Sequence, residues 1–452
     1  MSNLYDLPGI EHARILDRDQ HSISRKNISP NALKVLRRLH DNNFSGFLVG
    51  GGVRDLLLGE LPKDFDIATD ATPEELKQLF RNSRIIGRRF KIVHIRFGRE
   101  IIEVTTFRAH HQSSQQITSG SSRRQIKGLD SAHTSAGMLV RDNVYGQIDE
   151  DAIRRDFTVN ALYYTTDGFK LLDFSSGLDD LDERTIRIIG DPETRYREDP
   201  VRMLRALRFA AKLGFEIEAQ TAEPIDRLAI LLQSISPARM FDEVLKLFSS
   251  GYGVATFSKI KSSPLGRYTI GPTLEALPKA SAPAQELLEL ALENTDARIA
   301  QGKSVTAYFL FAALLWPALQ LRLQQSASAD QKSGPGLVAA ANEVLAEQQV
   351  HTAIPRRISY ASREIWELQW KLENRTRRTV NSTVNHPRFR AAYDFLLLRE
   401  QAGEELGDSG RWWTDFQLGD TNQQEQLLST LPRPKRRRRR RRKSKTSGNN
   451  SG

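Results

Sequence analysis

The fold is decided by the stretch LVGGGVRDLLLG at residues 48–59, which is followed closely by KDFDIAT at residues 63–69. Glycine has no Cβ, so a glycine-rich turn lets phosphate oxygens approach backbone N–H groups. Asp64 and Asp66 stand two residues apart, and on a strand such residues project to the same face. Two carboxylates on one face repel each other and tend to recruit a hard cation, which beside a phosphate is usually Mg²⁺. Together the two stretches predict nucleotidyl transfer, in which metal ions stabilise the attacking and leaving oxygens.

Each stretch also has an ordinary interpretation. A glycine-rich turn is most often only a turn, and an isolated Asp-x-Asp is most often solvated surface. The flanking residues favour the functional interpretation. Residues 47–49 form a short apolar run that leads into the glycines, which is typical of a buried strand. Phe65 and Ile67 alternate with Asp64 and Asp66, so we expect the acids on one face of a strand and the apolar side chains on the other.

Composition limits the class of protein. A chain of 452 residues is long enough for two or more domains with sizeable cores. Because cysteine is absent, disulfides, thiolate nucleophiles and Cys-ligated metals are excluded, and a reducing, cytoplasmic location is expected. Residues 1–19 lack the apolar segment of a signal peptide. The longest apolar stretch, residues 307–321, is too short to span a bilayer, so we expect no membrane association.

The net charge of +11 comes entirely from the last twenty residues. Residues 433–452 contain eleven basic and no acidic residues, so residues 1–432 hold 55 basic against 55 acidic residues. Such a block does not fold alone, and its physical use is attraction to a polyanion such as RNA. The alternative is a tail that only aids solubility. The predicted RNA-binding residues are Arg436, Arg437, Arg438, Arg439, Arg440, Arg441 and Arg442.

Periodicity along the chain predicts an α/β catalytic head with a small mixed sheet, then all-α neck and body domains, then a disordered basic tail. Helices are expected to start at Pro30 and Pro73, each after an N-cap residue, and a fifth strand is expected near residues 159–164. The other strands are expected at residues 47–49, 65–69, 92–97 and 100–106. The predicted segments are a poorly ordered N-terminus at 1–28, the head at 29–165 with a mobile loop at 109–136, the neck at 166–240, the body at 241–420 and the tail at 421–452.

A second candidate element is RRDFTVNAL at residues 154–162. Arginine presents a planar fork of donors that suits triphosphate oxygens, which makes Arg155 a candidate nucleotide-binding residue. Asp156 fits two roles, either a further acid of the site or an anchor that holds an arginine in place. The ordinary alternative is an exposed turn with a surface ion pair.

A third element is EDPVRMLRALRF at residues 198–209, where Pro200 fits the first turn of a helix. Arg202 and Arg205 stand three residues apart and can share a helix face. Asp199 and Arg202 could read a base edge, because an acid accepts from an exocyclic amine and an arginine donates to the neighbouring ring nitrogen. Adenine and cytosine both present that pattern, so the motif cannot choose between them. The ordinary alternative is a solvated basic face with a capping acid.

With these three elements in this order, the chain resembles the class II nucleotidyltransferases of the polymerase β superfamily, which include CCA-adding tRNA nucleotidyltransferases and bacterial poly(A) polymerases. The resemblance covers most of residues 30–420 and is closest to the poly(A) polymerase branch. The segment 109–136 shows no confident match to the family pattern. The branch resemblance rests on IIGRRFKIVHIRFG at 85–98, IIEVTTFRAHH at 101–111, GDPETRYREDP at 190–200, IPRRISYASREIW at 354–366 and HPRFRAAYDFLLLR at 386–399.

The resemblance implies roles for single residues. Asp64 and Asp66 would hold catalytic Mg²⁺ or Mn²⁺, with Asp156 as a further catalytic acid and Glu103 as the alternative third carboxylate. Asp199 and Arg202 would lie at the base edge. The full set of implied nucleotide-binding residues is Gly51, Arg54, Arg155, Asp199, Arg202 and Arg205.

The resulting hypothesis is template-independent transfer of AMP from ATP to RNA 3′ ends, releasing pyrophosphate, as in the polyadenylation of mRNA. CCA addition to tRNA is the alternative within the family. The basic tail argues against it, because a run of charge suits varied RNA better than one folded tRNA. The alternative from another class is a non-catalytic RNA-binding protein, and the paired acids at Asp64 and Asp66 argue against that.

Overall fold

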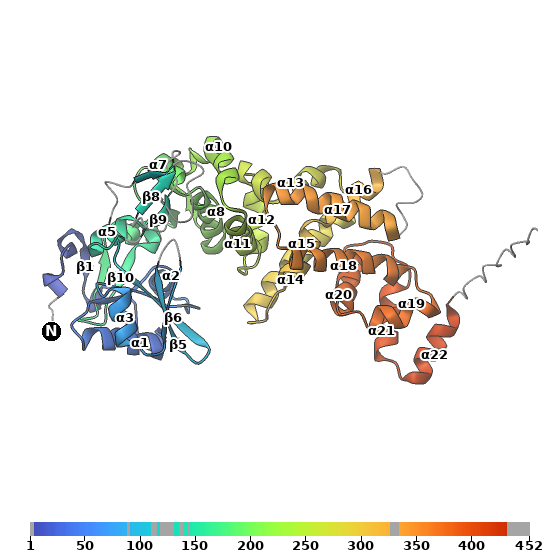
Figure 1. Ribbon diagram of the computed structural model, residues 1–452, viewed down its shortest axis with the longest axis horizontal. Helices are drawn as coiled ribbons and strands as arrows, with labels where there is room; N and C mark the ends of the chain where they lie inside the picture. Colours follow the sequence, from blue (N-terminus) through green and yellow to red (C-terminus); the bar gives the residue numbers. More distant parts are fainter. Residues whose placement is uncertain are drawn as a thin grey trace, which may run out of the picture. The chain divides into compact units, whose positions relative to one another are not determined.

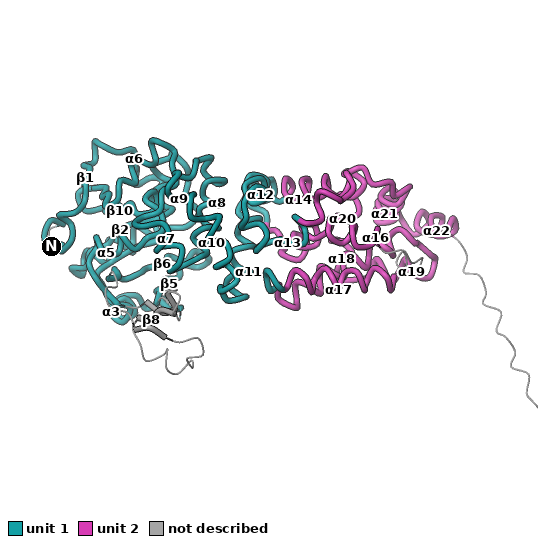
Figure 2. The backbone as a smooth tube through the Cα atoms, turned by 90° about the horizontal axis from the view of Figure 1, so that it is seen from above, with its two compact units in different colours: residues 1–274, 295–303, 350–353 teal, residues 275–294, 304–349, 354–452 magenta. Residues whose placement is uncertain are grey.

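The computed structural model describes residues 4–87, 91–109, 115–117, 131–134, 139–142, 144–325 and 334–431. The chain divides into two compact units, which Figure 2 shows in different colours. Unit 1 comprises residues 1–274, 295–303 and 350–353, and unit 2 comprises residues 275–294, 304–349 and 354–452. Unit 1 therefore continues past residue 240, where we expected the neck to end. Within the described ranges, no helix combines the length and the apolar character needed to cross a bilayer.

An eight-stranded mixed sheet forms the centre of the catalytic head in unit 1 (Figure 1), which confirms the predicted fold class. The strand order is β1-β11-β10-β2-β3-β6-β5-β4. Strands β3 and β6 run parallel, and the other neighbouring strands pair antiparallel. The bounds are β1 Arg14–Leu16, β2 Gly46–Val49, β3 Asp66–Thr69, β4 Ser83–Ile86, β5 Ile92–Phe97, β6 Glu100–Thr106, β10 Leu162–Tyr164 and β11 Leu171–Asp173.

Helices α1 (Pro30–His40) and α3 (Pro73–Leu79) start where the sequence predicts. The side chain of Ser29 accepts hydrogen bonds from two backbone N–H groups of the first turn of α1. Thr72 caps α3 in the same way, and Glu75 completes a capping box by bonding back to the Thr72 backbone. Helix α1 contacts β2, and α3 contacts β4 and β5, so both helices cover the sheet that carries the aspartates (Figure 1).

The N-terminal segment is built into the head, so the expectation of a poorly ordered segment is wrong for residues 4–28. Strand β1 pairs with β11 and forms an edge of the sheet. Leu4 and Ile10 are buried in a core that also contains Phe47, Tyr163 and Leu172. Because these apolar side chains pack against residues far away in the sequence, the local polarity of residues 1–28 did not indicate that this segment would be ordered. The short 3₁₀ turns of this segment are Leu4–Asp6, Ile10–His12, Arg18–Gln20 and Arg25–Asn27.

The predicted mobile loop at 109–136 falls largely outside the described residues. Within and just after it, the structure describes three short strands, β7 (Gln115–Ile117), β8 (Ser131–Thr134) and β9 (Leu139–Asp142). They form a small separate sheet in the order β7-β8-β9.

Helices follow the sheet, as the sequence predicts. The longer helices of unit 1 are α8 and α11, which pack against each other and against α12. Besides α1 and α3, the described α-helices placed wholly in unit 1 are α2 Gly51–Leu57, α5 Ile148–Ile153, α6 Gly177–Asp182, α7 Pro192–Glu198, α8 Val201–Leu213, α9 Ala219–Ala222, α10 Ile225–Leu228, α11 Pro237–Phe248 and α12 Gly253–Lys261. A further two-stranded ladder joins β12 (Thr185–Ile186) to β13 (Glu216–Ile217).

Unit 2 is helical, and part of its core gathers around Trp412 and Trp413, which pack against helices α18 and α20. Helices α13 (Arg267–Ala276), α14 (Ala282–Ala300) and α17 (Gly334–His351) each contain a boundary between the two units. The remaining helices are α15 Ala307–Leu314, α16 Trp316–Gln325, α18 Arg356–Glu373, α19 Arg377–Val384, α20 Phe389–Gln401, α21 Ser409–Leu418 and α22 Thr421–Thr430.

Helix α22 corrects the predicted start of the tail. Residues 421–430 were expected to be disordered, but Asp420 caps a regular helix there through a capping box with Gln423. The arginine run at residues 436–442 lies outside the described residues.

Candidate active site

The glycine turn connects β2 to α2 and lies beside the aspartates. Gly50 has a φ of 69° and a ψ of −139°, a backbone conformation that favours glycine. A Cβ on Gly50 would lie 3.4 Å from Nη1 of Arg155 and 4.0 Å from Oδ2 of Asp66. A Cβ on Gly51 would lie 3.3 Å from Nη2 of Arg54. The glycines therefore keep open the space between two arginines and a carboxylate.

The exposure of the two aspartates alternates with burial of their apolar neighbours, as the sequence predicts, but strand β3 begins only at Asp66, so Asp64 lies just before it. Asp64 and Asp66 are exposed, whereas Phe65 and Ile67 between and after them are buried. Asp66 opens β3 and is in register with Glu103 on β6. Desolvation by the surrounding protein and repulsion from Glu103 raise the pKa of Asp66 to about 6, Arg155 partly offsets them, and Asp64 adds to the rise.

This concentration of negative charge fits a divalent cation, which would relieve the repulsion that raises the Asp66 pKa. The described residues contain no group of three or more acidic, His or Cys side chains arranged to hold a metal. A two-carboxylate site still suits Mg²⁺, since this ion often binds through one or two carboxylates together with water and substrate phosphates. Asp64 and Asp66 are the residues that would hold it.

Of the two candidates for a third acid, Glu103 is the one beside Asp66. Glu103 also makes a 3.0 Å contact with Nε2 of His94 on the next strand. Asp156 instead forms an ion pair with Arg205, in which Nε of Arg205 donates to Oδ2 at 2.7 Å. Burial alone would raise the pKa of Asp156, but Arg205 and a hydrogen bond from Asn160 outweigh it and lower the pKa to about 2. These contacts match the anchoring role weighed for Asp156, and its role as a catalytic acid stays a prediction.

Arg54 is buried and held from two sides. Its Nε and Nη2 both donate to Oδ1 of Asp55, at 2.9 and 2.6 Å, and its Nη1 donates to Asn160. Oδ2 of Asp55 also accepts from Nζ of Lys212 at 3.1 Å. The guanidinium of Arg54 lies over the ring of Phe209 at 5.4 Å. One carboxylate therefore positions two cations on different helices.

Arg155 is fixed in a similar way on the other side of the glycine turn. Its Nε donates to Oη of Tyr163 at 2.8 Å, and its Nη2 donates to Oδ2 of Asp151 at 3.2 Å. Tyr163 in turn donates to the same Asp151 oxygen at 2.6 Å. A Cβ built on Gly50 would lie close to both the Arg155 guanidinium and the Asp66 carboxylate, so these two groups lie on either side of the same small space.

The two predicted base-reading residues are close in the chain but are held by different side-chain partners. Nη1 of Arg202 donates to the carbonyl of Arg195 at 2.8 Å and to Oε2 of Glu198 at 2.9 Å. Asp199 accepts from Nη2 of Arg239 on α11 at 2.5 Å. Asp199 and Arg202 thus have separate partners, and the reading of a base edge by the two together stays a prediction.

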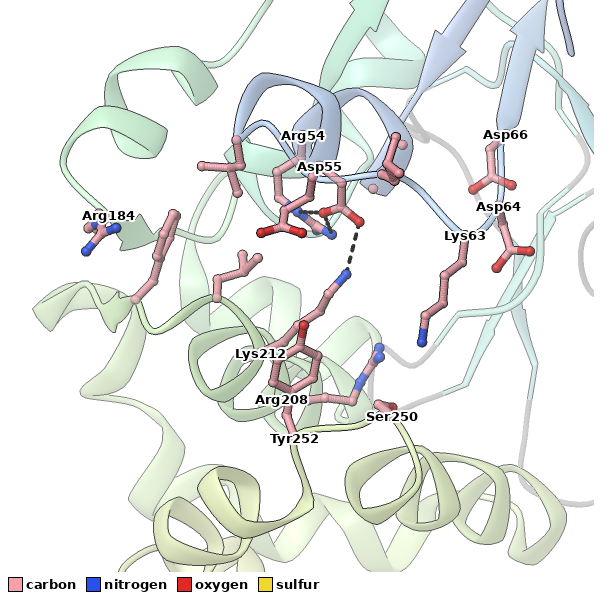
Figure 3. A pocket seen from close by; sticks show the side chains of 17 residues that line it. Arg54, Asp55, Lys63, Asp64, Asp66, Arg184, Arg208, Lys212, Ser250 and Tyr252 are labelled. Carbon is pink, nitrogen blue, oxygen red and sulfur yellow. Dashed lines mark hydrogen bonds and ion pairs between the residues drawn. The ribbon is translucent and has the colours of Figure 1, made fainter. Parts of the chain in front are cut away.

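A cavity of about 610 Å³ begins at the aspartates and extends along α2 and α8. Figure 3 shows Asp64 and Asp66 at one end of it, and Arg54, Asp55 and Lys212 beside its middle. Burial and neighbouring arginines lower the pKa values of both Arg208 and Lys212. Cations crowded in this way favour binding of an anion. The cationic side chains lining the cavity are Arg54, Lys63, Arg184, Arg208 and Lys212.

Sequence reasoning missed several of these residues. Lys212 continues the basic face of α8, since it follows Arg208 by four residues, and this spacing was a usable signal. Asp55 stood inside the quoted glycine stretch, but its partner Lys212 is 157 residues away. Lys63 directly precedes the aspartates. Tyr252, which also lines the cavity, gave no local signal.

Three family models match this chain. The model described as "Poly A polymerase head domain" matches residues 46–187. "Probable RNA and SrmB-binding site of polymerase A" matches residues 214–277, and "Polymerase A arginine-rich C-terminus" matches residues 329–446.

Whole-chain comparisons agree with these matches. Poly(A) polymerase I of Escherichia coli O6:H1 is 46% identical over 93% of this chain and 90% of its own length. Poly(A) polymerase I of Haemophilus influenzae is 42% identical over 95% of this chain and 94% of its own length. A solved structure of a CCA-adding enzyme in an apo form aligns with a TM-score of 0.57 and 17% identity, covering 93% of this chain and 91% of that one. At that identity the solved structure supports the fold alone.

Proposed function

The chain belongs to the poly(A) polymerase family of nucleotidyltransferases, and we propose that it transfers AMP from ATP to RNA 3′ ends through a centre built on Asp64 and Asp66. One observation carries the site assignment. Two exposed carboxylates, one with its pKa raised to about 6, stand at the end of a cavity lined by five cationic side chains. Carboxylates for a metal and cations for a triphosphate are what this reaction requires.

The reaction breaks one bond and forms one. The 3′-hydroxyl oxygen of the RNA attacks the α-phosphorus of ATP, the bond from that phosphorus to the bridging oxygen of the β-phosphate breaks, and pyrophosphate leaves. Mg²⁺ or Mn²⁺ held by Asp64 and Asp66 would supply charge neutralisation and favour the deprotonated hydroxyl. Side chains of the protein would bind and orient the triphosphate.

The positioned cations suit the triphosphate. Arg54 and Lys212 share Asp55, so neither can swing away from the cavity without breaking a charged hydrogen bond. Arg155 is held by Tyr163 beside the aspartates. Guanidinium groups fixed before the substrate arrives lose less side-chain entropy on binding and stabilise the charge that develops on the leaving pyrophosphate.

Selection of ATP is proposed for Asp199 and Arg202. Together they match an amine donor beside a ring-nitrogen acceptor, which adenine and cytosine share. The preference for ATP over CTP rests on the similarity to the poly(A) polymerases named above, and not on this motif. RNA is the second substrate, and the match of residues 214–277 to a probable RNA-binding model supports this. We propose that the arginine run at residues 436–442 adds nonspecific affinity for RNA.

The test combines purified protein, Mg²⁺ and an unstructured RNA with each nucleoside triphosphate in turn. Long tails made only with ATP are the expected result. A tRNA lacking its 3′ CCA end is the second acceptor. If the protein adds C, C and A to it and then stops, the result would support the CCA-adding alternative instead. No incorporation with any nucleotide would favour a non-catalytic RNA-binding protein. Asp64→Asn serves as the matched inactive control, because it keeps the side-chain size and removes the charge.

A further inference from the structure

Asp64 and Asp66 line two separate cavities. The first is the cation-lined cavity described above. The second, of about 590 Å³, lies over strands β5 and β6. Apart from Lys63 and the two aspartates, the two cavities share no lining residue. The metal-holding carboxylates therefore stand at the junction of two spaces, and the proposed ATP site occupies one of them.

Strand register shows which side chains extend from this junction. Asp66 is paired with Glu103, Glu103 with His94, and His94 with Arg84, so these four lie in one row across β3, β6, β5 and β4. Directly paired residues point to the same face of a sheet. Arg96 is paired with Ile101 in the next row on that face. Figure 1 shows β5 and β6 side by side at this edge of the head.

At the outer part of this face, arginines supply positive charge and Ile101 supplies an exposed apolar side chain. We define the acceptor face as Arg84, His94, Arg96, Arg99 and Ile101. Its three arginines are exposed, and none makes an ion pair with another residue in the described part of the chain. Ile101 is 36% exposed.

Besides the two metal-holding aspartates, the wall of the second cavity contains two acids, Glu100 and Glu103, and each has a partner of its own. Glu100 accepts hydrogen bonds from Ser29 and Asn31 at the start of α1. Glu103 contacts His94 at 3.0 Å. Apart from the two aspartates and Lys63 at the junction, the arginines of the acceptor face are therefore the charged groups available to a polyanion on this side.

We propose that the acceptor face binds the single-stranded 3′-terminal nucleotides of the RNA, with Arg96 and Arg99 at backbone phosphates and Ile101 against the terminal nucleoside. This inference rests on the proposed function. In nucleotidyl transfer the attacking and leaving oxygens lie roughly in line on opposite sides of the phosphorus. If the triphosphate extends into the first cavity, the attacking hydroxyl arrives from the other side of the aspartates. The second cavity is the space that the structure provides there.

The test is a charge reversal with a matched control. Arg96→Glu/Arg99→Glu is compared with Arg18→Glu/Lys26→Glu, which changes the charge equally at exposed positions near the opposite sheet edge, beside β1. The acceptor is a short oligoadenylate, so that distant basic segments contribute little. We expect the acceptor-face variant to raise the KM for RNA at least tenfold and to leave the KM for ATP unchanged. Loss of two phosphate contacts on a single strand should also reduce the slope of log affinity against log salt by about 1.4.

Two results would overturn the proposal. One is an RNA KM in the acceptor-face variant equal to that of the control variant, while wild-type protein extends the oligomer normally. The other comes from a photo-crosslinking base at the RNA 3′ end, tested without ATP, if it labels the first cavity and not residues 92–103. A wild-type protein that adds no AMP would instead refute the proposed function itself, so the two failures are distinguishable.

Discussion

Removing the charge of Asp55 should weaken both the head and its hold on ATP. Asp55 accepts two hydrogen bonds from Arg54 and one from Lys212, and the Arg54 side chain is only 2% exposed. Removal of one partner from a buried ion pair typically costs about 3–5 kcal/mol, because a charge is left buried without compensation. We therefore expect Asp55→Ala to lower the free energy of unfolding by about 3–5 kcal/mol.

Asp55→Asn gives a graded version of the same test. Its amide oxygen can still accept from Arg54, but its NH2 group cannot accept from Lys212, so the loss should be closer to about 1.5–3 kcal/mol, the usual range for a hydrogen bond to a charged group. Calorimetry measures the stability change, and steady-state kinetics measures the KM for ATP. We expect a higher ATP KM with an unchanged RNA KM, since both cations that Asp55 positions line the triphosphate cavity.

Asp41→Asn is the matched control, because Asp41 is exposed at the end of α1. It should change neither quantity by more than experimental error. The reasoning fails if Asp55→Asn behaves like Asp41→Asn in both assays. A loss of stability with an unchanged ATP KM would show that Asp55 supports folding without positioning the substrate-binding cations.

Four further predictions follow from the site and its surroundings. Asp66→Ala should cost several kcal/mol of transition-state stabilisation while RNA binding persists, and near wild-type turnover at saturating Mg²⁺ would contradict the metal assignment. Arg202→Ala should narrow the preference for ATP over GTP and UTP by roughly 1–3 kcal/mol, whereas a slower enzyme with unchanged preference would show that Arg202 does not read the base. Deleting residues 433–452 should raise the RNA KM and flatten its salt dependence, so equal salt slopes with and without the tail would refute its role in RNA binding. The pKa of Asp156 is lowered from its ordinary 3.8 to about 2, so its ion pair with Arg205 stabilises the fold fully above about pH 4 and is lost as the pH falls through 2. The difference in free energy of unfolding between wild type and Asp156→Asn, measured during acid titration, should therefore disappear over that pH range.

Local patterns in the sequence predicted the local parts of the head. The strands expected at residues 92–97 and 100–106 match β5 and β6, because alternation of apolar and polar residues depends only on neighbours. The starts of α1 and α3 were predicted for the same reason, since a cap and its helix lie within four residues. The placement of Asp64 and Asp66 on an open face also followed from alternation with Phe65 and Ile67.

Local sequence patterns did not predict which charged side chains pair with each other in the folded protein. Arg202 in α8 pairs with Glu198, the last residue of the preceding helix α7. Asp199 is paired with Arg239, 40 residues away. The position of Glu103 beside Asp66 depends on the parallel register of β3 and β6, which no local pattern contains. Tertiary contacts of this kind decide which charged side chain receives which partner, and one sequence alone leaves them open.

The order of strands in the sheet sets the order in which the head can be completed on the ribosome. Strand β1 is made first, yet its partner β11 ends at Asp173. The sheet cannot close until that residue has left the exit tunnel, and until then the edges of β2 and β10 are exposed to other chains. The nascent chain therefore carries Asp64 and Asp66 for more than a hundred residues of synthesis before the last strand of their sheet has been made. Long-range pairing of this kind also slows folding, so a nascent-chain arrest series should show protease resistance of the head appearing only after residue 173 has emerged.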